Sequence, residues 1–145
     1  MTESLVIRGR PPRSTAVALL QAQGLPVSDI TDEHLEHFFF IACNGSASGL
    51  VGLEVYGGDA LLRSLVVGEN ARRHGLGSML TDHAEQYAAS MGVRSIYLLT
   101  TTAEAFFKRL GYEHIERSQA PPSIQRTREF ASLCPASSAF MVKSL

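Results

Sequence analysis

The chain has 145 residues, of which 45% are hydrophobic and 19% are charged, and its formal net charge at pH 7 is −1. This length and composition predict one globular domain over residues 1–145 with a buried apolar core. The charge balance and the lack of basic runs argue against a nucleic-acid partner. No apolar run reaches the roughly eighteen residues of a membrane-spanning helix. Arginines and prolines interrupt the N-terminus where a signal peptide needs an apolar run, so we expect a cytoplasmic protein without a membrane partner.

Cysteine and histidine positions predict neither a disulfide framework nor a metal site. Cys43 and Cys134 lie far apart and form no Cys-x-x-Cys motif, which fits a reducing compartment. The segment 33–37 reads Glu-His-Leu-Glu-His, which differs from the zinc motif His-Glu-x-x-His. We therefore expect no bound metal.

The first half of the chain is expected to form a strand, a helix and an antiparallel three-stranded meander. Alternating apolar and polar residues predict a strand at 5–10, and a helix-forming run follows at 13–23. After a linker, strands are expected at 37–43, 50–56 and 60–67, separated by Asn-Gly and Gly-Gly-Asp turns.

The second half is expected to alternate between helices and strands. The pattern predicts an amphipathic helix at 78–91, a strand at 95–100, a helix at 103–110, a strand at 112–117, a helix at 124–133 and a last strand at 139–145. A right-handed crossover through the first of these helices makes the strands on its two sides parallel neighbours, so their C-terminal ends should separate around a cleft. The fold class is therefore α/β (α+β).

The segment 68–77, between the third strand of the meander and the long helix, predicts an anion-binding loop. Gly75 and Gly77 let the backbone approach a ligand, and the first N–H groups of the following helix have no partner within it. A phosphate there gains hydrogen bonds and the positive end of the helix dipole, about 0.3 to 2 kcal/mol. Arg72 and Arg73 add positive charge at the entrance.

Other phosphate motifs fit this segment less well. Leu80 stands where a dinucleotide fingerprint needs its third glycine, and the chain has no Gly-Lys-Ser/Thr of a P-loop. Residues 72–77, Arg-x-x-Gly-x-Gly, resemble instead the acetyl-CoA signature Gln/Arg-x-x-Gly-x-Gly/Ala of the GCN5-related N-acetyltransferase (GNAT) family. Residues 103–112, Ala-x-x-x-Phe-x-x-x-Gly-Tyr, resemble that family's second signature, Ala-x-x-x-Tyr-x-x-x-Gly-Phe/Tyr.

The resemblance implies a mixed central sheet of six to seven strands flanked by about four helices, and acetyl-CoA as co-substrate. It places the following residues at the cofactor: Leu65, Val66, Val67, Arg72, Arg73, His74, Gly75, Leu76, Gly77, Ser78, Thr101, Phe106 and Phe107. Backbone N–H groups of the strand around Leu65 would stabilise the oxyanion. The family's tyrosine, which often reprotonates the departing thiolate, is Phe107 here and cannot donate a proton. A thiol with a pKa of about 8.5 can nevertheless leave without an acid.

Three segments resemble particular members of this family. Residues 62–65, 97–103 and 129–135 look like the small N-acetyltransferases of arsenic-resistance operons, and the Leu-Leu-Thr-Thr run is similar to the acetyltransferase domain of N-acetylglutamate synthase. This implies that the substrate is the primary amine of a small molecule, either an amino acid or an analogue such as phosphinothricin or an organoarsenical. The alternative is that 129–135 merely packs the last strand.

Candidate substrate and catalytic residues follow from the charges near this site. Arg63 interrupts the most apolar strand, so either a protein carboxylate such as Glu54 neutralises it or an anionic substrate does. Arg126 and Arg128 are further candidates for binding an acid group. Glu54 and Ser64, on adjacent strands, could relay the proton of the amine through water, although Glu54 could equally be an ordinary surface carboxylate.

Two other functions stay open at this point. The chain could be a non-catalytic acyl-CoA-binding or sensor module, because Phe107 is no acid and the base is unassigned. It could also be a protein N-acetyltransferase, which would need a long open groove, whereas residues 121–135 could cover the site and enclose a small molecule. A homodimer is also left open.

Overall fold

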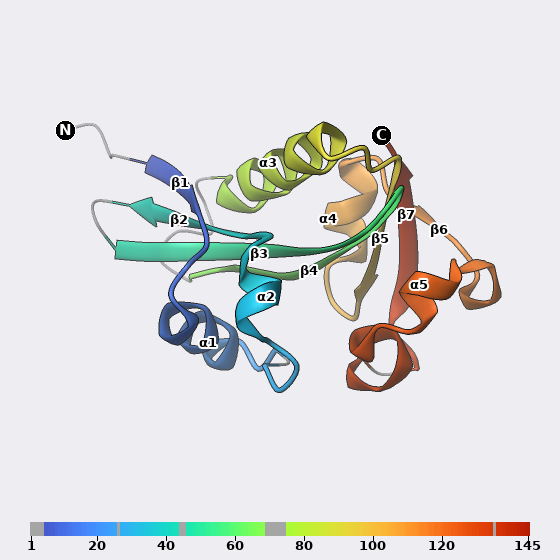
Figure 1. Cartoon of the computed structure of the whole chain (residues 1–145), viewed down its shortest axis with the longest axis horizontal. Coiled ribbons are helices and arrows are strands. Elements are labelled where there is room, and N and C mark those ends of the chain that lie inside the picture. The colour runs from blue at the N-terminus through green and yellow to red at the C-terminus, as the bar shows by residue number, and fades with distance from the viewer. Residues whose placement is uncertain (1–4, 26, 44–45, 69–74, 135) are drawn as a thin grey trace.

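The structure is a computed structural model that describes residues 5–25, 27–43, 46–68, 75–134 and 136–145. Its centre is a seven-stranded sheet in the order β1-β2-β3-β4-β5-β7-β6 (Figure 1). The strands are β1 (Leu5–Gly9), β2 (Phe38–Cys43), β3 (Ser46–Tyr56), β4 (Asp59–Val67), β5 (Ser95–Thr100), β6 (Glu113–His114) and β7 (Ala139–Ser144). The α-helices are α1 (Arg13–Ala22), α2 (Asp32–Leu35), α3 (Leu76–Ser90), α4 (Glu104–Arg109) and α5 (Pro122–Gln125).

The sheet confirms the predicted mixed α+β fold. Neighbouring strands are antiparallel except β4 and β5, which are parallel and are connected through α3. Helices α3 and α4 cover one face of the sheet, and α1, α2 and α5 lie on the other (Figure 1). None of the described helices combines the length and apolar character needed to cross a membrane.

Each helix is held by a few fully buried apolar side chains. Leu80 and Ala84 of α3 pack into the main core, Leu20 of α1 into a second cluster and Ile124 of α5 into a third. Burying these apolar side chains covers both faces of the sheet with helices.

The parallel strands β4 and β5 pair over only a short stretch. Their register runs from Asp59 opposite Ser95 to Leu61 opposite Tyr97, after which β5 continues to pair with β7 but not with β4. A register shift between β3 and β4 follows directly, and Ser64 there has a φ of 61°, in the left-handed region. Since a bulge bends its strand and increases the local twist, β4 turns away from β5 at this point.

Two predicted elements differ in the structure. The strand expected at 112–117 is reduced to Glu113–His114, whose exposed charged side chains lie at the sheet edge, and a 3₁₀ turn at Arg117–Gln119 follows. The helix expected at 124–133 is broken into α5 and a π-helical turn at Glu129–Leu133. The Thr127 hydroxyl lies between them, where it donates to the Ile124 carbonyl at 2.7 Å and competes with the helix ladder.

The short helix α2 lies in a region expected to be a linker. Thr31 caps it, because its hydroxyl accepts the His34 N–H at 3.3 Å while the His34 ring accepts the Thr31 N–H, also at 3.3 Å. This is a capping box in which histidine replaces the usual glutamate or glutamine. The replacement concealed the helix from the sequence pattern.

Gly52 on β3 allows close packing in the sheet interior. A Cβ atom there would overlap the ring of Phe38, so Gly52→Ala is expected to lower the free energy of unfolding by about 1 to 3 kcal/mol. Gly58, in the β3–β4 turn, has open space around it, and Gly58→Ala should change stability by less than about 1 kcal/mol. Urea denaturation of both variants checks the prediction, and equal stabilities would contradict it.

Candidate active site

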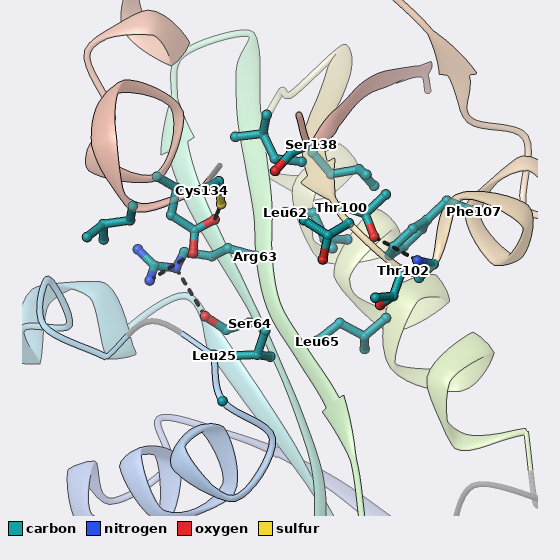
Figure 2. Close-up of a pocket in the computed structure, with 17 residues that line it drawn as sticks. Leu25, Leu62, Arg63, Ser64, Leu65, Thr100, Thr102, Phe107, Cys134 and Ser138 are labelled. Carbon is teal, nitrogen blue, oxygen red and sulfur yellow. Dashed lines mark hydrogen bonds and ion pairs between the residues drawn. The ribbon is translucent and has the colours of Figure 1, made fainter. Parts of the chain in front are cut away.

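A cavity of about 420 Å³ opens where β4 and β5 separate (Figure 2). Its walls come from residues 62–65 of β4, residues 98–103 of β5 and the following loop, Phe107 of α4, and residues of the segment before β7. A second hollow of about 250 Å³ shares Leu25, Leu65 and Thr102 with it. The two hollows are therefore neighbours along the bulged strand, and we refer to them together as the depression.

Several residues predicted to contact the cofactor lie along this depression. Leu65, Val66 and Val67 line the second hollow, and Thr101 and Phe107 line the cavity. The strands thus bring together residues that the sequence placed at one site from motifs far apart in the chain.

The start of α3 supplies the glycines of the predicted phosphate loop. Gly75 precedes the helix with a φ of 68°, which favours glycine, and Leu76 begins the helix two residues earlier than predicted. A Cβ atom at Gly77 would lie 3.2 Å from the ring of Phe106, so Gly77 also permits close packing between α3 and α4. Ser78 is exposed in the first turn. Arg72, Arg73 and His74 lie outside the described residues.

Arg63 is completely buried beside the cavity and is bound by three carboxylates. Nη1 donates to Asp29 Oδ2 at 2.5 Å and to Glu54 Oε2 at 2.8 Å. Nη2 donates to Asp29 Oδ1 at 2.8 Å and forms an ion pair with Glu129 Oε1 at 3.1 Å, while Nε donates to Ser64 Oγ at 3.1 Å. Of the five N–H donors of a guanidinium, four make these hydrogen bonds, and Glu129 is held by the ion pair alone.

The sequence left open whether a protein carboxylate or an anionic substrate neutralises Arg63, and in the structure its partners are protein carboxylates. Three carboxylates share one guanidinium, so the cluster of Asp29, Glu54, Arg63 and Glu129 carries an excess of negative charge. Burial alone would raise the pKa of Asp29, but the hydrogen bonds and charge of Arg63 outweigh it and hold this pKa below its usual value. Glu129 has a single contact to Arg63, and burial raises its pKa to about 7, aided by the charges of Asp29 and Glu54.

The two predicted proton-relay residues both contact Arg63. Glu54 is buried away from the cavity, where it also accepts the Tyr56 hydroxyl proton at 2.5 Å, whereas Ser64 lines the cavity. The guanidinium therefore stands between Glu54 and Ser64. Arg126 and Arg128 are exposed, and neither belongs to the residues that line the cavity.

Five further polar residues on the cavity wall were not predicted, two of which are Thr100 and Thr102 after β5 has left β4. Glu129, Cys134 and Ser138 all come from the segment before β7 (Figure 2). The thiol of Cys134 lies 3.8 Å from Glu129 Oε2, and burial followed by this negative charge raises the pKa of Cys134 to about 12. The signal that could have identified Glu129 is a lone carboxylate in the otherwise weakly polar run Glu-Phe-Ala-Ser-Leu-Cys.

Phe107 occupies the predicted position of the proton donor. Its ring lies edge-to-face with Phe106 and Tyr112, and it is buried. The Tyr112 hydroxyl donates to Glu85 at 3.0 Å and so does not replace the missing donor in the cavity. Among the described residues that line the cavity there is no tyrosine.

Strand β4 is bulged and separates from its parallel neighbour β5, and the glycine-led helix α3 connects the two strands. The family model described as the acetyltransferase (GNAT) family matches residues 11–112, and the chain belongs to this family.

One curated relative and two solved structures of the same fold are similar to this chain. The uncharacterized N-acetyltransferase CT2212 of Chlorobaculum tepidum is 36% identical over 95 residues, which are 65% of this chain and 61% of that protein. N-acetylglutamate synthase of Neisseria gonorrhoeae, solved with coenzyme A and N-acetyl-glutamate, has a TM-score of 0.84 at 18% identity over 98% of this chain and 35% of its own. Rv2747 of Mycobacterium tuberculosis, solved with CoA and NLQ, has a TM-score of 0.77 at 21% identity, over 97% of this chain and 99% of its own.

The raised pKa of Glu129 predicts a pH-dependent stability. Its pKa rises from 4.5 to about 7 on folding, so its favourable contribution is complete below pH 4.5 and is lost as the pH rises to about 7. This difference corresponds to about 3 kcal/mol. Glu129→Gln should therefore gain stability relative to the wild type between pH 5 and pH 8, measured by urea denaturation.

The exposed Glu116 provides the control. Glu116→Gln should leave the pH dependence of stability as in the wild type. If Glu129→Gln also followed the wild-type curve, the carboxyl group of Glu129 would titrate normally and the assignment would be wrong.

Proposed function

We propose that the protein is an acetyl-CoA-dependent N-acetyltransferase that acts on the primary amine of a small molecule. The observation that carries this proposal is the depression where β4 leaves β5, with one cavity beside the bulge and an adjacent hollow along the outer part of β4. A thioester located at their junction would have the acyl carbon beside the cavity and the remainder of the cofactor along β4.

The residues present fit coenzyme A. The helix α3 has fifteen residues and begins after a left-handed glycine, so its first N–H groups are available to a pyrophosphate. Gly77 has no side chain between its backbone and a ligand, and a Cβ atom there would crowd the ring of Phe106. The solved relatives that contain coenzyme A support the same assignment.

The chain's contribution to acyl transfer is mostly positional and electrostatic. The backbone of β4 beyond Leu61 has left β5, and we assign the N–H of Leu65 as a donor to the carbonyl oxygen as it gains negative charge. With Phe107 in the tyrosine position, the departing sulfur leaves as thiolate and takes its proton from the amine or from solvent.

The proposed substrate class is an amino acid or an amino-acid analogue. N-acetylglutamate synthase of Neisseria gonorrhoeae was solved with N-acetyl-glutamate and with L-arginine, which supports an α-amine substrate. Because three protein carboxylates already surround Arg63, a substrate carboxylate must bind elsewhere. The sequence resemblance to acetyltransferases of arsenic-resistance operons adds phosphinothricin and organoarsenical amino acids to the class.

An amine panel tests this proposal. The protein and acetyl-CoA are incubated with L-amino acids, phosphinothricin, an organoarsenical amino acid, aminoglycosides and a peptide with a free N-terminus. We expect thiol release that depends on a small amine, with the acetylated product identified by mass spectrometry. Acetyl-CoA binding without transfer to any amine would favour the sensor module, and acetylation of the peptide alone would favour a protein acetyltransferase.

Substitution of Gly77 tests the cofactor site. Gly77→Asp places a carboxylate where the phosphate is expected and should weaken acetyl-CoA binding at least tenfold, measured by isothermal titration calorimetry. Gly58→Asp introduces the same charge in an open turn and should leave the affinity unchanged. Equal affinities for all three proteins would overturn the cofactor assignment.

A further inference from the structure

Only one of the two oxygens of the Glu129 carboxylate contacts Arg63. Its Oε1 atom forms the ion pair with Arg63, and its Oε2 atom accepts a hydrogen bond from the Cys134 thiol at 3.8 Å. A thiol is a weak hydrogen-bond donor. Since Glu129 lines the cavity, Oε2 can accept a stronger donor that enters there.

The hydroxyl of Ser138 lies on the same cavity and is unsatisfied. Ser138 is 6% exposed, and its Oγ atom has no hydrogen-bond partner among the described residues. A buried hydroxyl without a partner is costly, so it indicates a group that the bound substrate supplies. Ser138 and Glu129 are therefore two polar positions on the cavity wall, which also carries the hydroxyls of Ser64, Thr100, Thr101 and Thr102.

The charges around Glu129 favour a bound cation. Charged and titratable groups face Glu129 from four parts of the chain, namely Arg63, Asp29, Glu54 and Cys134. Arg63 is the one cation in this group, and the three carboxylates around it outnumber it. A protonated amine satisfies both unsatisfied atoms with its several N–H donors, whereas a second acid group would be repelled.

We propose that Glu129 receives the ammonium group of the substrate and removes one of its protons, with Ser138 as a second hydrogen-bond partner of the same nitrogen. This inference rests on the proposed N-acetyltransferase function and assigns its missing base. Glu129 takes a proton from R–NH₃⁺ and becomes neutral, and the free amine forms the C–N bond as the thioester C–S bond breaks. The second nitrogen proton leaves with the sulfur as thiol, and Glu129 returns its proton to solvent.

The protonation behaviour of Glu129 suits this role. Burial raises its pKa to about 7, so at neutral pH it exists both as a base and as an acid. Glu54 is buried behind Arg63 and is not on the cavity wall, so it lacks the access that Glu129 has.

The test compares Glu129→Gln, Ser138→Ala and the exposed control Glu116→Gln with the wild type, using acetyl-CoA and the panel amine with the highest kcat/KM. Glu129→Gln should lower kcat/KM about 10²- to 10⁴-fold at neutral pH and should lose the wild-type rise in rate near pH 7. Its deficit should shrink as the pH approaches the pKa of the amine. Ser138→Ala should raise KM about 2- to 10-fold, and Glu116→Gln should match the wild type.

Hydroxylamine, a nucleophile that is largely uncharged at neutral pH, separates proton removal from a structural effect. Acetyl transfer to hydroxylamine should be nearly equal in the wild type and Glu129→Gln, and acetyl-CoA affinity should also be equal. A wild-type pH profile in Glu129→Gln, or equal losses with the amine and with hydroxylamine, would overturn the role of Glu129 while leaving the proposed function intact. No transfer by the wild type to any amine would overturn both.

Discussion

The site depends on one buried guanidinium. Arg63 joins three parts of the chain that are distant in sequence: the loop before α2 through Asp29, strand β3 through Glu54, and the π-helical turn through Glu129. Burying such a cluster is costly, but removing one partner from a buried ion pair costs about 3 to 5 kcal/mol because the remaining charge is left uncompensated. Arg63 therefore holds the turn that closes the cavity against the strand from which the cavity opens.

The same position on β4 also sets the shape of the cavity. Arg63 pairs with Gly52 across the sheet, and the register shift begins at the next residue, Ser64, whose backbone is left-handed. The bend in β4 and the early end of its pairing with β5 expose backbone beside the cavity. In this short segment the side chain of Arg63 holds the carboxylates, and the backbone of Ser64 bends the strand. The next residue, Leu65, lines both hollows.

The sequence predicted the sheet well because strands and the long helix have periodic patterns, and because the two motifs place α3 and α4 in the known order of the family. It also identified Arg63, Ser64 and Phe107, which all line the cavity. It could not identify Asp29 or Glu129 as partners of Arg63, since the Asp29 contact spans 34 positions and no local pattern encodes it. The break between α5 and the π-helical turn was also missed, because it depends on the hydroxyl of Thr127 and not on hydrophobic spacing.

Glu129 distinguishes this arrangement from a fully neutralised ion cluster, since it is the carboxylate that Arg63 holds by one contact and that faces the cavity. A carbon-13 NMR titration of the side-chain carboxyl groups measures this property directly, with Glu129→Gln used to assign the resonance. We predict one carboxyl signal, absent from the variant, that titrates at about pH 7. The carboxyl group of Asp29 should stay ionised at pH values below the ordinary pKa of an aspartate. A Glu129 signal that titrates near 4.5, the ordinary value for a glutamate, would contradict this account.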